Sequence, residues 1–288
     1  MKKHARFKMG RGKYSLVEEI AERLPAGRVL LEPFVGAGSV FLNTDYDAYV
    51  LNDINPDLIG LYNHLKQQPD SFISEARKLF VAEHNHKTAY YRLRTQFNQT
   101  AAGFERAQLF LFLNRHGFNG LCRYNKKGVQ RSLRFLQETL LPGERAVGVC
   151  REGAEGDVHL RKLCRRHGPC RGRLGDLLRS ALCPLSTTAS FTTYSAGGFT
   201  LDDQALLARL ARHTAAHKGV PVLISNHDIE LTRELYRGAR LDEILVKRTI
   251  SRNGGGRNKV AELLALYPPG IEPEQGYYPG EAELVAVG

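Results

Sequence analysis

The chain has 288 residues, with 41 Lys and Arg against 30 Asp and Glu, so its formal net charge is +11. This length suffices for a full α/β core with one smaller domain, and two domains are expected. The positive charge indicates a polyanionic partner, because neutralising phosphates releases counterions. Neither a run of about 18 apolar residues nor a basic, apolar leader is present, so we expect a soluble cytoplasmic protein. Five cysteines, an odd number, argue against a disulfide framework.

The first informative motif follows a short apolar run. Residues 28–32 predict a strand that ends in an acid, and Gly36-Ala37-Gly38 and Ser39 come next, with Ser39 opening a run that predicts a helix. Glycine suits such a turn because a Cβ would obstruct both the backbone angles and a ligand. A second apolar run, 49–51, leads to Asp53, at the spacing where nucleotide-binding α/β folds hold ribose hydroxyls. The pattern alone fits a nucleoside-type ligand and an ordinary α/β turn with a surface Asp equally well.

Residues 57–128 are mostly helical in periodicity. The apolar residues that recur at helical spacing, and that we expect in the core, are Leu58, Leu61, Tyr62, Leu65, Ala107, Phe110, Leu111 and Leu113. The segment 115–125 is different, because glycines punctuate it and it combines cations, amides and an aromatic ring. Such groups suit phosphate contact, base-edge contact and stacking on a nucleic acid.

Four segments of the chain resemble the DNA adenine methylase (Dam) family. They are residues 32–41, 52–55, 114–125 and 223–228. The resemblance implies an α/β fold, namely a Rossmann-like, S-adenosylmethionine-dependent methyltransferase core with an inserted helical DNA-recognition domain. It implies methyl transfer from S-adenosylmethionine to adenine N6 in double-stranded GATC sites. It also implies roles in mismatch repair and DNA replication for a monomeric, nucleoid-associated bacterial protein.

The resemblance also implies domain boundaries. The methyltransferase core would comprise residues 1–56 and 145–267, and the helical target-recognition domain would comprise residues 57–144. Residues 268–288 are rich in Pro, Gly and Glu without an apolar period, so we expect a disordered tail.

By this resemblance, the methyl donor is bound by residues from three stretches of the chain: Met9, Lys13, Glu32, Phe34, Gly36, Gly38 and Asp53. Asp53 would hold the ribose, and Lys13 the carboxylate of the donor. The N-terminal stretch departs from the family pattern, since Met9 replaces a tryptophan that closes over the cofactor and Arg11 replaces a glycine. A basic, disordered arm is the alternative for this stretch.

The resemblance assigns DNA contacts to Lys8, Arg115, Phe118, Asn119, Leu121, Arg123 and Asn125. Arg123 would contact a guanine through two hydrogen bonds, and Phe118 would wedge into the duplex beside the extruded adenine. Asn119 and Leu121 would contact base edges. A solvated or paired loop arginine is the alternative for Arg123.

The acceptor motif of the family, Asp-Pro-Pro-Tyr, does not occur in this chain. In the family, its carboxylate and a main-chain carbonyl hold the exocyclic amine while the tyrosine stacks on the extruded base. At the corresponding place the chain has Arg179, Ser180, Ala181 and Leu182, none of which supplies a carboxylate. No catalytic residue is therefore assigned, and a catalytically inactive DNA-binding protein is the alternative function.

The composition of residues 129–183 differs from that of the remaining chain. This span has 11 Lys and Arg against 6 Asp and Glu, contains four of the five cysteines, and lacks Tyr, Asn and Ile. A reading-frame shift explains these features. If the last two bases of each codon are joined to the first base of the next, allowed codons turn residues 177–183 into Tyr-Cys-Asp-Pro-Pro-Tyr-Ala. We therefore predict that residues 129–183 are an out-of-frame translation.

A zinc site is the alternative explanation for the cysteines. Cys164, His167 and Cys170, together with Cys150 or Cys183, could supply thiolate and imidazole ligands. Their spacing matches no zinc module, and the frame shift explains the cysteines without a metal. No metal site is expected.

The resemblance resumes at residue 184. Residues 202–217 predict a helix that turns Leu206, Leu207 and Leu210 inward, and residues 220–225 predict a strand. For Asp228, just beyond that strand, a helix cap or a loop hydrogen bond is favoured over catalysis. Residues 251–259 predict a turn between a strand and a helix, with cations that suit phosphate contact or simply form a flexible basic loop.

Overall fold

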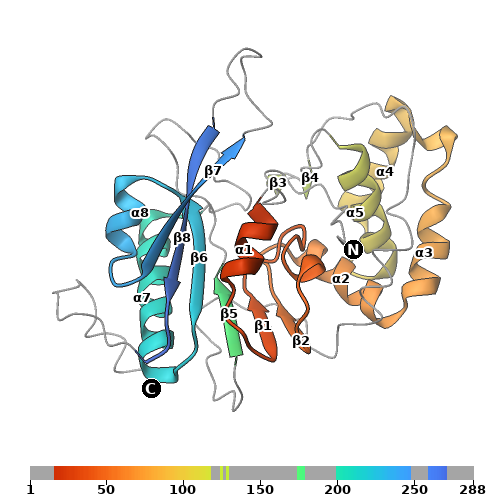
Figure 1. Cartoon of the computed structure of the whole chain (residues 1–288). Coiled ribbons are helices and arrows are strands. Elements are labelled where there is room, and N and C mark those ends of the chain that lie inside the picture. Colours follow the sequence, from red (N-terminus) through yellow and green to blue (C-terminus); the bar gives the residue numbers. More distant parts are fainter. Residues whose placement is uncertain are drawn as a thin grey trace. The chain divides into compact units, whose positions relative to one another are not determined.

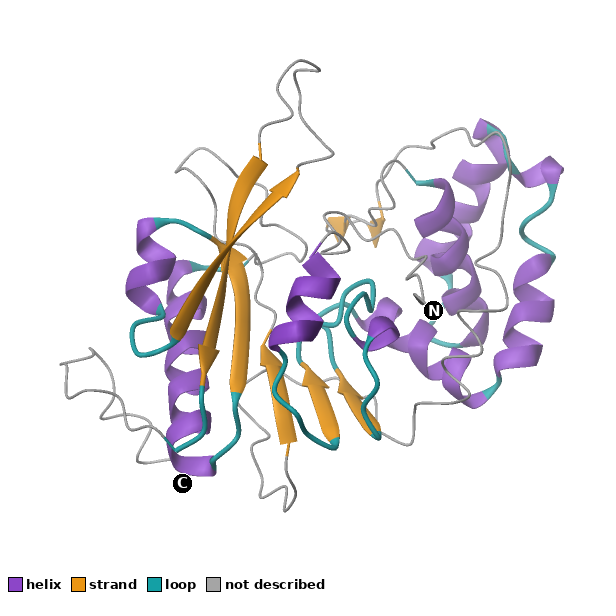
Figure 2. Ribbon diagram, in the orientation of Figure 1, coloured by secondary structure: helices purple, strands orange, loops and turns teal. Residues whose placement is uncertain are grey.

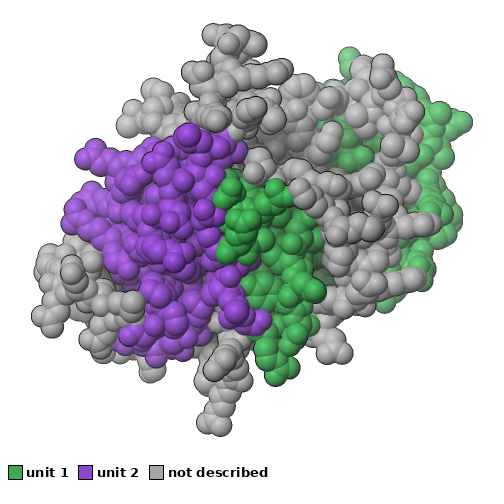
Figure 3. Space-filling model, in the orientation of Figure 1, with its two compact units in different colours: residues 1–22, 28–172, 193–198 green, residues 23–27, 173–192, 199–288 purple. Residues whose placement is uncertain are grey.

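The computed structural model describes residues 16–117, 124–125, 128–129, 174–178, 199–247 and 259–270. The chain divides into two compact units (Figure 3). Unit 1 comprises residues 1–22, 28–172 and 193–198, and unit 2 comprises residues 23–27, 173–192 and 199–288. Each unit combines helices with strands (Figures 1 and 2), which agrees with the expected α/β class.

Unit 1 begins with α1 (Val17–Arg23), whose last residue already belongs to unit 2, and continues with a pair of parallel strands. The strands β1 (Val29–Glu32) and β2 (Ala48–Leu51) run side by side with Glu32 opposite Leu51. Both predicted strands are thereby confirmed. Because the pair is parallel, the two carboxyl ends lie at the same edge, and the residues that follow them are close together.

The helix expected to open at Ser39 is wrong. The chain forms only a short 3-10 turn, η2 (Phe41–Asn43), and becomes extended at Thr44. The amide of Asn43 donates to the Ser39 carbonyl oxygen at 2.8 Å, and the Thr44 hydroxyl donates to the Val40 carbonyl oxygen at 3.0 Å. These side-chain bonds occupy carbonyl groups that a longer helix would use, so the helix does not propagate.

Residues 56–116 of unit 1 are mostly helical, as expected. They contain α2 (Pro56–Gln67), α3 (Pro69–Arg77), η3 (Ala82–His84), α4 (Lys87–Gln99) and α5 (Phe104–His116). Helix α5 packs against α2, α3 and α4, and it is buried nearly all round. All eight residues predicted for this core are buried.

A short hairpin follows α5 in the chain. Its strands β3 (Tyr124–Asn125) and β4 (Gly128–Val129) are antiparallel, with Tyr124 opposite Val129.

Unit 2 contains four strands that neighbour one another in the order β5-β6-β8-β7. The strands are β5 (Leu174–Leu178), β6 (Val222–His227), β7 (Arg240–Lys247) and β8 (Lys259–Tyr267), and only β5 and β6 are parallel. Every residue of β6 is buried, and α7 (Leu201–Lys218) packs against this strand. The last helix of the unit is the short α8 (Glu230–Leu235).

Helix α7 confirms the helix predicted over residues 202–217 and gives it clear ends. Thr200 and Asp203 form a capping box at its start, and Gly219 ends it with φ of 64°. The predicted inward face is partly wrong, because Leu207 is fully buried while Leu206 and Leu210 are half-buried. Small and polar residues such as Ala208 and Ala211 occupy the buried face instead.

The turn predicted between a strand and a helix at residues 251–259 is also corrected. Its flanks are the two antiparallel strands β7 and β8, with Lys247 opposite Lys259. The second element is a strand because its residues 262–267 pair with β6 and its residues 259–266 pair with β7, and this pairing overrides the local sequence preference. Residues 251–258 themselves lie outside the described part.

The helices among the described residues include none that is long and apolar enough to cross a bilayer. Within the same residues, no group of three His, Cys, Asp or Glu side chains is placed to bind a metal. The alternative zinc site cannot be placed, since all five cysteines lie outside the described part.

We predict that His116 makes the protein less stable at acidic pH. The ring is buried at the end of α5, it stacks on Phe112 at 4.0 Å between ring centroids, and its Nδ1 lies 3.0 Å from the Phe112 carbonyl oxygen. Burial lowers the pKa of His116 below its ordinary value of 6.5. The unfolded chain therefore binds this proton at higher pH than the folded chain, so the free energy of unfolding falls as the pH drops below 6.5.

Urea unfolding of the native chain and of His116→Phe, at about pH 7.5 and about pH 5.5, tests this prediction. Phenylalanine fills a similar volume and cannot be protonated. The variant should lose less stability between the two pH values than the native chain does. An equal loss in both proteins would contradict the prediction.

Candidate functional site

The candidate site of unit 1 is the glycine loop that follows β1. Two backbone hydrogen bonds join the end of β1 and the loop after it to Asn52, which follows β2. Asn52 N donates to the Glu32 carbonyl oxygen, and Val35 N donates to the Asn52 carbonyl oxygen, both at 2.8 Å. Gly36 and Gly38 then adopt positive φ angles of 51° and 68°. Only glycine takes this conformation without steric cost, which explains the Gly-Ala-Gly sequence.

Asp53 fastens this loop to the end of β2. Its Oδ2 accepts a hydrogen bond from Gly36 N, and its Oδ1 accepts one from Asn55 N, both at 3.0 Å. The structure thus brings Asp53 and Gly36 together, as the sequence pattern predicted for a nucleoside site. The carboxylate is held in one orientation at the carboxyl edge of the strands.

Two further side chains form hydrogen bonds with the backbone of the loop and of the residues that follow it. The Tyr62 hydroxyl on α2 donates to the Gly36 carbonyl oxygen at 2.8 Å. Glu32 is fully buried, and its Oε2 accepts from Phe41 N at 3.2 Å. Glu32 therefore holds the two ends of the loop together, in addition to its predicted place in the donor site.

Two residues of this site were missed by the sequence analysis. Tyr62 was expected only as a core residue, although its hydroxyl reaches the loop. Ile54 directly follows Asp53 and is 63% exposed, the most of any large apolar side chain in the described part of the chain. The available signal for Ile54 was an apolar residue inside the polar Asn52-Asp53-Ile54-Asn55 turn.

Of the other residues predicted to contact the donor or the DNA, only three lie in the described part of the chain. Phe34 is half-buried in the turn after β1, and Arg115 lies in the last turn of α5. Asn125 belongs to β3, where only its backbone is described. The other predicted residues lie outside the described part of the chain: Lys8, Met9, Lys13, Phe118, Asn119, Leu121 and Arg123.

Unit 2 has a buried polar group at the carboxyl end of β6. The Asn226 amide donates to the Tyr236 hydroxyl at 2.9 Å and to Gln204 Oε1 at 3.2 Å. Asp228 binds Arg233 of α8 through two hydrogen bonds of 2.5 Å. This confirms a loop contact for Asp228, in line with the interpretation favoured over catalysis.

The described part of strand β5 ends just before the place where the acceptor motif is missing. Leu177 and Leu178 lie opposite Leu223 and Ile224 of β6 in parallel register. Ligands of open α/β sheets bind at the carboxyl ends of such strands. The residues Arg179 to Leu182 themselves lie outside the described part.

The fold is that of an α/β protein in which each unit contains a pair of parallel strands. Comparison with known proteins specifies the class further. Residues 12–133 and 183–250 match the model of the D12 class N6 adenine-specific DNA methyltransferases, and residues 134–182 between them do not.

Named relatives extend the same comparison. The DNA adenine methylase of Vibrio cholerae is 49% identical over 289 residues, which covers 95% of this chain and 100% of the relative. Those of Serratia marcescens and Escherichia coli (strain K12) are 47% and 45% identical, over 93% and 94% of this chain and 100% and 98% of the relatives.

The chain therefore belongs to the D12 class N6 adenine-specific DNA methyltransferase family. Family and relatives together indicate a DNA adenine methyltransferase, which is an enzyme that acts on DNA.

Replacing Gly38 with alanine should disrupt the glycine loop. The new Cβ would overlap the Phe41 ring, and the φ of 68° would strain any L-residue. We expect Gly38→Ala to lower the free energy of unfolding by about 1–3 kcal/mol. Urea unfolding measures this change.

Gly60→Ala in α2 is the matched control, because its Cβ would meet no atom within 4 Å. This substitution should raise the free energy of unfolding by about 0.5–1 kcal/mol. Equal effects of the two substitutions would contradict the assigned loop geometry.

Proposed function

We propose that this protein transfers a methyl group from S-adenosylmethionine to adenine N6 in double-stranded GATC sites. The observation that carries the proposal is the glycine loop fastened to Asp53 at the carboxyl edge of β1 and β2. Membership of the adenine methyltransferase family supports the reaction class. The donor, the acceptor atom and the recognition sequence come from the resemblance described above.

The described residues fit the nucleoside part of this donor. Asp53 is oriented by two backbone N–H groups, and its carboxylate is suited to ribose hydroxyls. Beside it, the exposed Ile54 offers apolar surface to an adenine ring. When bound, S-adenosylmethionine supplies a methyl group on a sulfonium, which is already a strong leaving group. Gly36, Gly38, Glu32 and Phe34 shape the loop, and Met9 and Lys13 would complete the site.

The DNA would bind next to the end of α5. Arg115 lies in the last turn of this helix, and the segment that follows carries most of the proposed base contacts. Arg123 and Phe118 would recognise a guanine and wedge into the duplex. Lys8, Asn119, Leu121 and Asn125 would add further contacts. The net charge of +11 favours such a complex through counterion release.

The proposed activity requires an acceptor motif that the printed sequence lacks. We propose that the coding frame is shifted across residues 129–183, through a sequencing error or a compensating pair of insertions and deletions. Two observations support this proposal. The family match is interrupted between residues 134 and 182, which lies inside that span. The restored frame also puts the Asp of Asp-Pro-Pro-Tyr directly after Leu178, at the carboxyl end of β5.

The decisive experiment compares the printed chain with a chain translated from the restored frame. Each protein is incubated with methyl-labelled S-adenosylmethionine and a duplex that contains one GATC site. The restored chain should transfer the methyl group, and the printed chain should be slower by at least about 10²-fold, because nothing holds the exocyclic amine. Replacing the restored Asp with Asn is the control, and it should abolish transfer without unfolding the protein.

The other outcomes are equally informative. Rapid transfer by the printed chain would show that the acceptor motif is dispensable. If the nucleotide sequence across codons 125–188 is correct and the printed chain binds GATC duplex without transfer, it is an inactive DNA-binding protein. No transfer by the restored chain would refute the proposed reaction.

Asp53→Asn should weaken donor binding. A hydrogen bond to a charged group contributes about 1.5–3 kcal/mol, so we expect the Kd of S-adenosylmethionine to rise about 10- to 100-fold. Isothermal titration calorimetry measures this Kd. Asp47→Asn is the control, because Asp47 forms only an exposed ion pair with Arg28 at 3.0 Å and should leave the Kd unchanged. Unchanged binding by Asp53→Asn would remove Asp53 from the donor site.

A further inference from the structure

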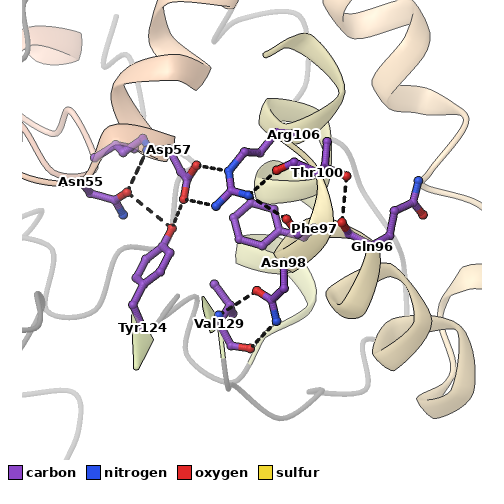
Figure 4. Close-up of polar contacts among 10 residues, drawn as sticks. Asn55, Asp57, Gln96, Phe97, Asn98, Thr100, Arg106, Tyr124 and Val129 are labelled. Atoms are coloured by element: carbon purple, nitrogen blue, oxygen red, sulfur yellow. Dashed lines mark hydrogen bonds and ion pairs between the residues drawn. The ribbon is translucent and has the colours of Figure 1, made fainter. Parts of the chain in front are cut away.

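The hairpin residue Tyr124 touches the beginning of helix α2 (Figure 4). Its hydroxyl donates to Asp57 Oδ2 at 2.6 Å, and Asn55 Oδ1 lies 3.5 Å away. Tyr124 and Asp57 are separated by 67 positions in the chain, so this is a tertiary contact. It joins the segment proposed to recognise DNA to helix α2, which begins three residues after Asp53.

Asp57 is held rigidly on its other side. Arg106 of α5 donates to both carboxylate oxygens, from Nε at 2.5 Å and from Nη2 at 3.2 Å. The hydrogen bond from Arg106 to Asp57 raises the pKa of the guanidinium, so Arg106 stays charged. Arg106 also donates to the carbonyl oxygens of Phe97 and Thr100 at 2.7 and 2.6 Å. Such a two-bond charged contact holds the Asp57 carboxylate in one position.

The second strand of the hairpin is fastened separately to α4. Asn98 Oδ1 accepts from Val129 N at 2.9 Å, and Asn98 Nδ2 donates to the Val129 carbonyl oxygen at 3.4 Å (Figure 4). Val129 is opposite Tyr124 in the hairpin. Both bonds use only the backbone of Val129, so they do not depend on which side chain stands there.

Asn55 connects this hairpin contact to the proposed donor site. Its backbone N–H donates to Asp53 Oδ1 at 3.0 Å. Its side-chain oxygen caps α2 by accepting from Asp57 N at 3.0 Å and lies next to the Tyr124 hydroxyl. A continuous path of hydrogen bonds therefore runs from Gly36 through Asp53, Asn55 and Asp57 to Tyr124.

We infer that Tyr124 is a positioning residue that couples binding of the methyl donor to binding of DNA. This inference rests on the proposed function, since it takes Asp53 as the ribose ligand and the neighbourhood of Tyr124 as the DNA-binding segment. A ligand that restrains Asp53 also restrains Asn55 and the start of α2, the surface on which Tyr124 lies. Donor binding thereby favours the arrangement in which the hydroxyl of Tyr124 is bonded to Asp57. By linkage, DNA that selects this arrangement tightens donor binding by the same factor.

The test measures that factor on the full-length chain. S-adenosylhomocysteine, which cannot transfer a methyl group, is titrated calorimetrically with and without a saturating duplex that contains one GATC site. Coupling free energies between sites usually correspond to about 5- to 150-fold changes in affinity, and we expect the native chain to fall in this range. In Tyr124→Phe, which removes only the hydroxyl, the factor should fall below about twofold.

Two control variants separate coupling from stability. Tyr91→Phe removes a hydroxyl on α4, away from this path, and should leave the factor unchanged. Asn98→Ala frees the other strand of the hairpin from α4 but keeps the Tyr124 contact. It should weaken duplex binding and leave the factor unchanged. A merely structural role of Tyr124 would instead make Tyr124→Phe behave like Asn98→Ala.

The possible results separate the coupling role of Tyr124 from the proposed function. If the native chain binds both ligands without mutual enhancement, or if Tyr124→Phe keeps the native factor, the coupling inference is wrong and the proposed function stands. If the native chain binds neither ligand, the proposed function fails, and the coupling inference fails with it. Loss of the factor in Tyr124→Phe alone supports the inference.

Discussion

The hydrogen bond from Gly36 N to the Asp53 carboxylate is the contact on which the candidate site of unit 1 depends. It joins the loops after two parallel strands whose register already puts their carboxyl ends at one edge. The same carboxylate accepts from Asn55 N, and Asn55 caps α2. One side chain therefore orients the glycine loop and the first turn of the helix that leads into the helical part of this unit. Its two N–H donors also hold the carboxylate in a fixed direction for a ligand.

This chain contains the glycine loop proposed to bind the donor, but it lacks the acceptor motif. The glycine loop proposed to bind the donor has positive φ angles at Gly36 and Gly38, and the chain matches the adenine methyltransferase family on both sides of residues 134–182. The acceptor motif is missing from the span that does not match. Strand β5 nevertheless pairs with β6 up to the position where the motif would begin. The proposed frame shift accounts for the missing motif, because the span that does not match the family lies inside residues 129–183.

The wrong sequence predictions share a physical cause. A helix was expected from Ser39, but the side chains of Asn43 and Thr44 bind the carbonyl groups that such a helix needs. A helix was expected after residue 259, but pairing with strands on both sides selects β8. Leu206 and Leu210 were expected to be buried, yet the face of α7 that packs inward is set by the strand it covers. In each case the outcome depends on a particular hydrogen bond or packed neighbour, which the periodicity of apolar residues does not reveal.

The sequence by itself determined the elements whose information is local. Apolar periodicity identified the strands β1 and β2 and the core of the helices of unit 1, and the Gly-Ala-Gly loop with Asp53 marked the proposed donor site. Only the tertiary structure decided contacts between residues far apart in the chain. The Tyr62 hydroxyl on the Gly36 carbonyl and the contact of Tyr124 with Asp57 carry no sequence signature, because a tyrosine in an apolar or loop pattern does not reveal where its hydroxyl points. Such contacts depend on how the helices pack, and packing sums many long-range interactions.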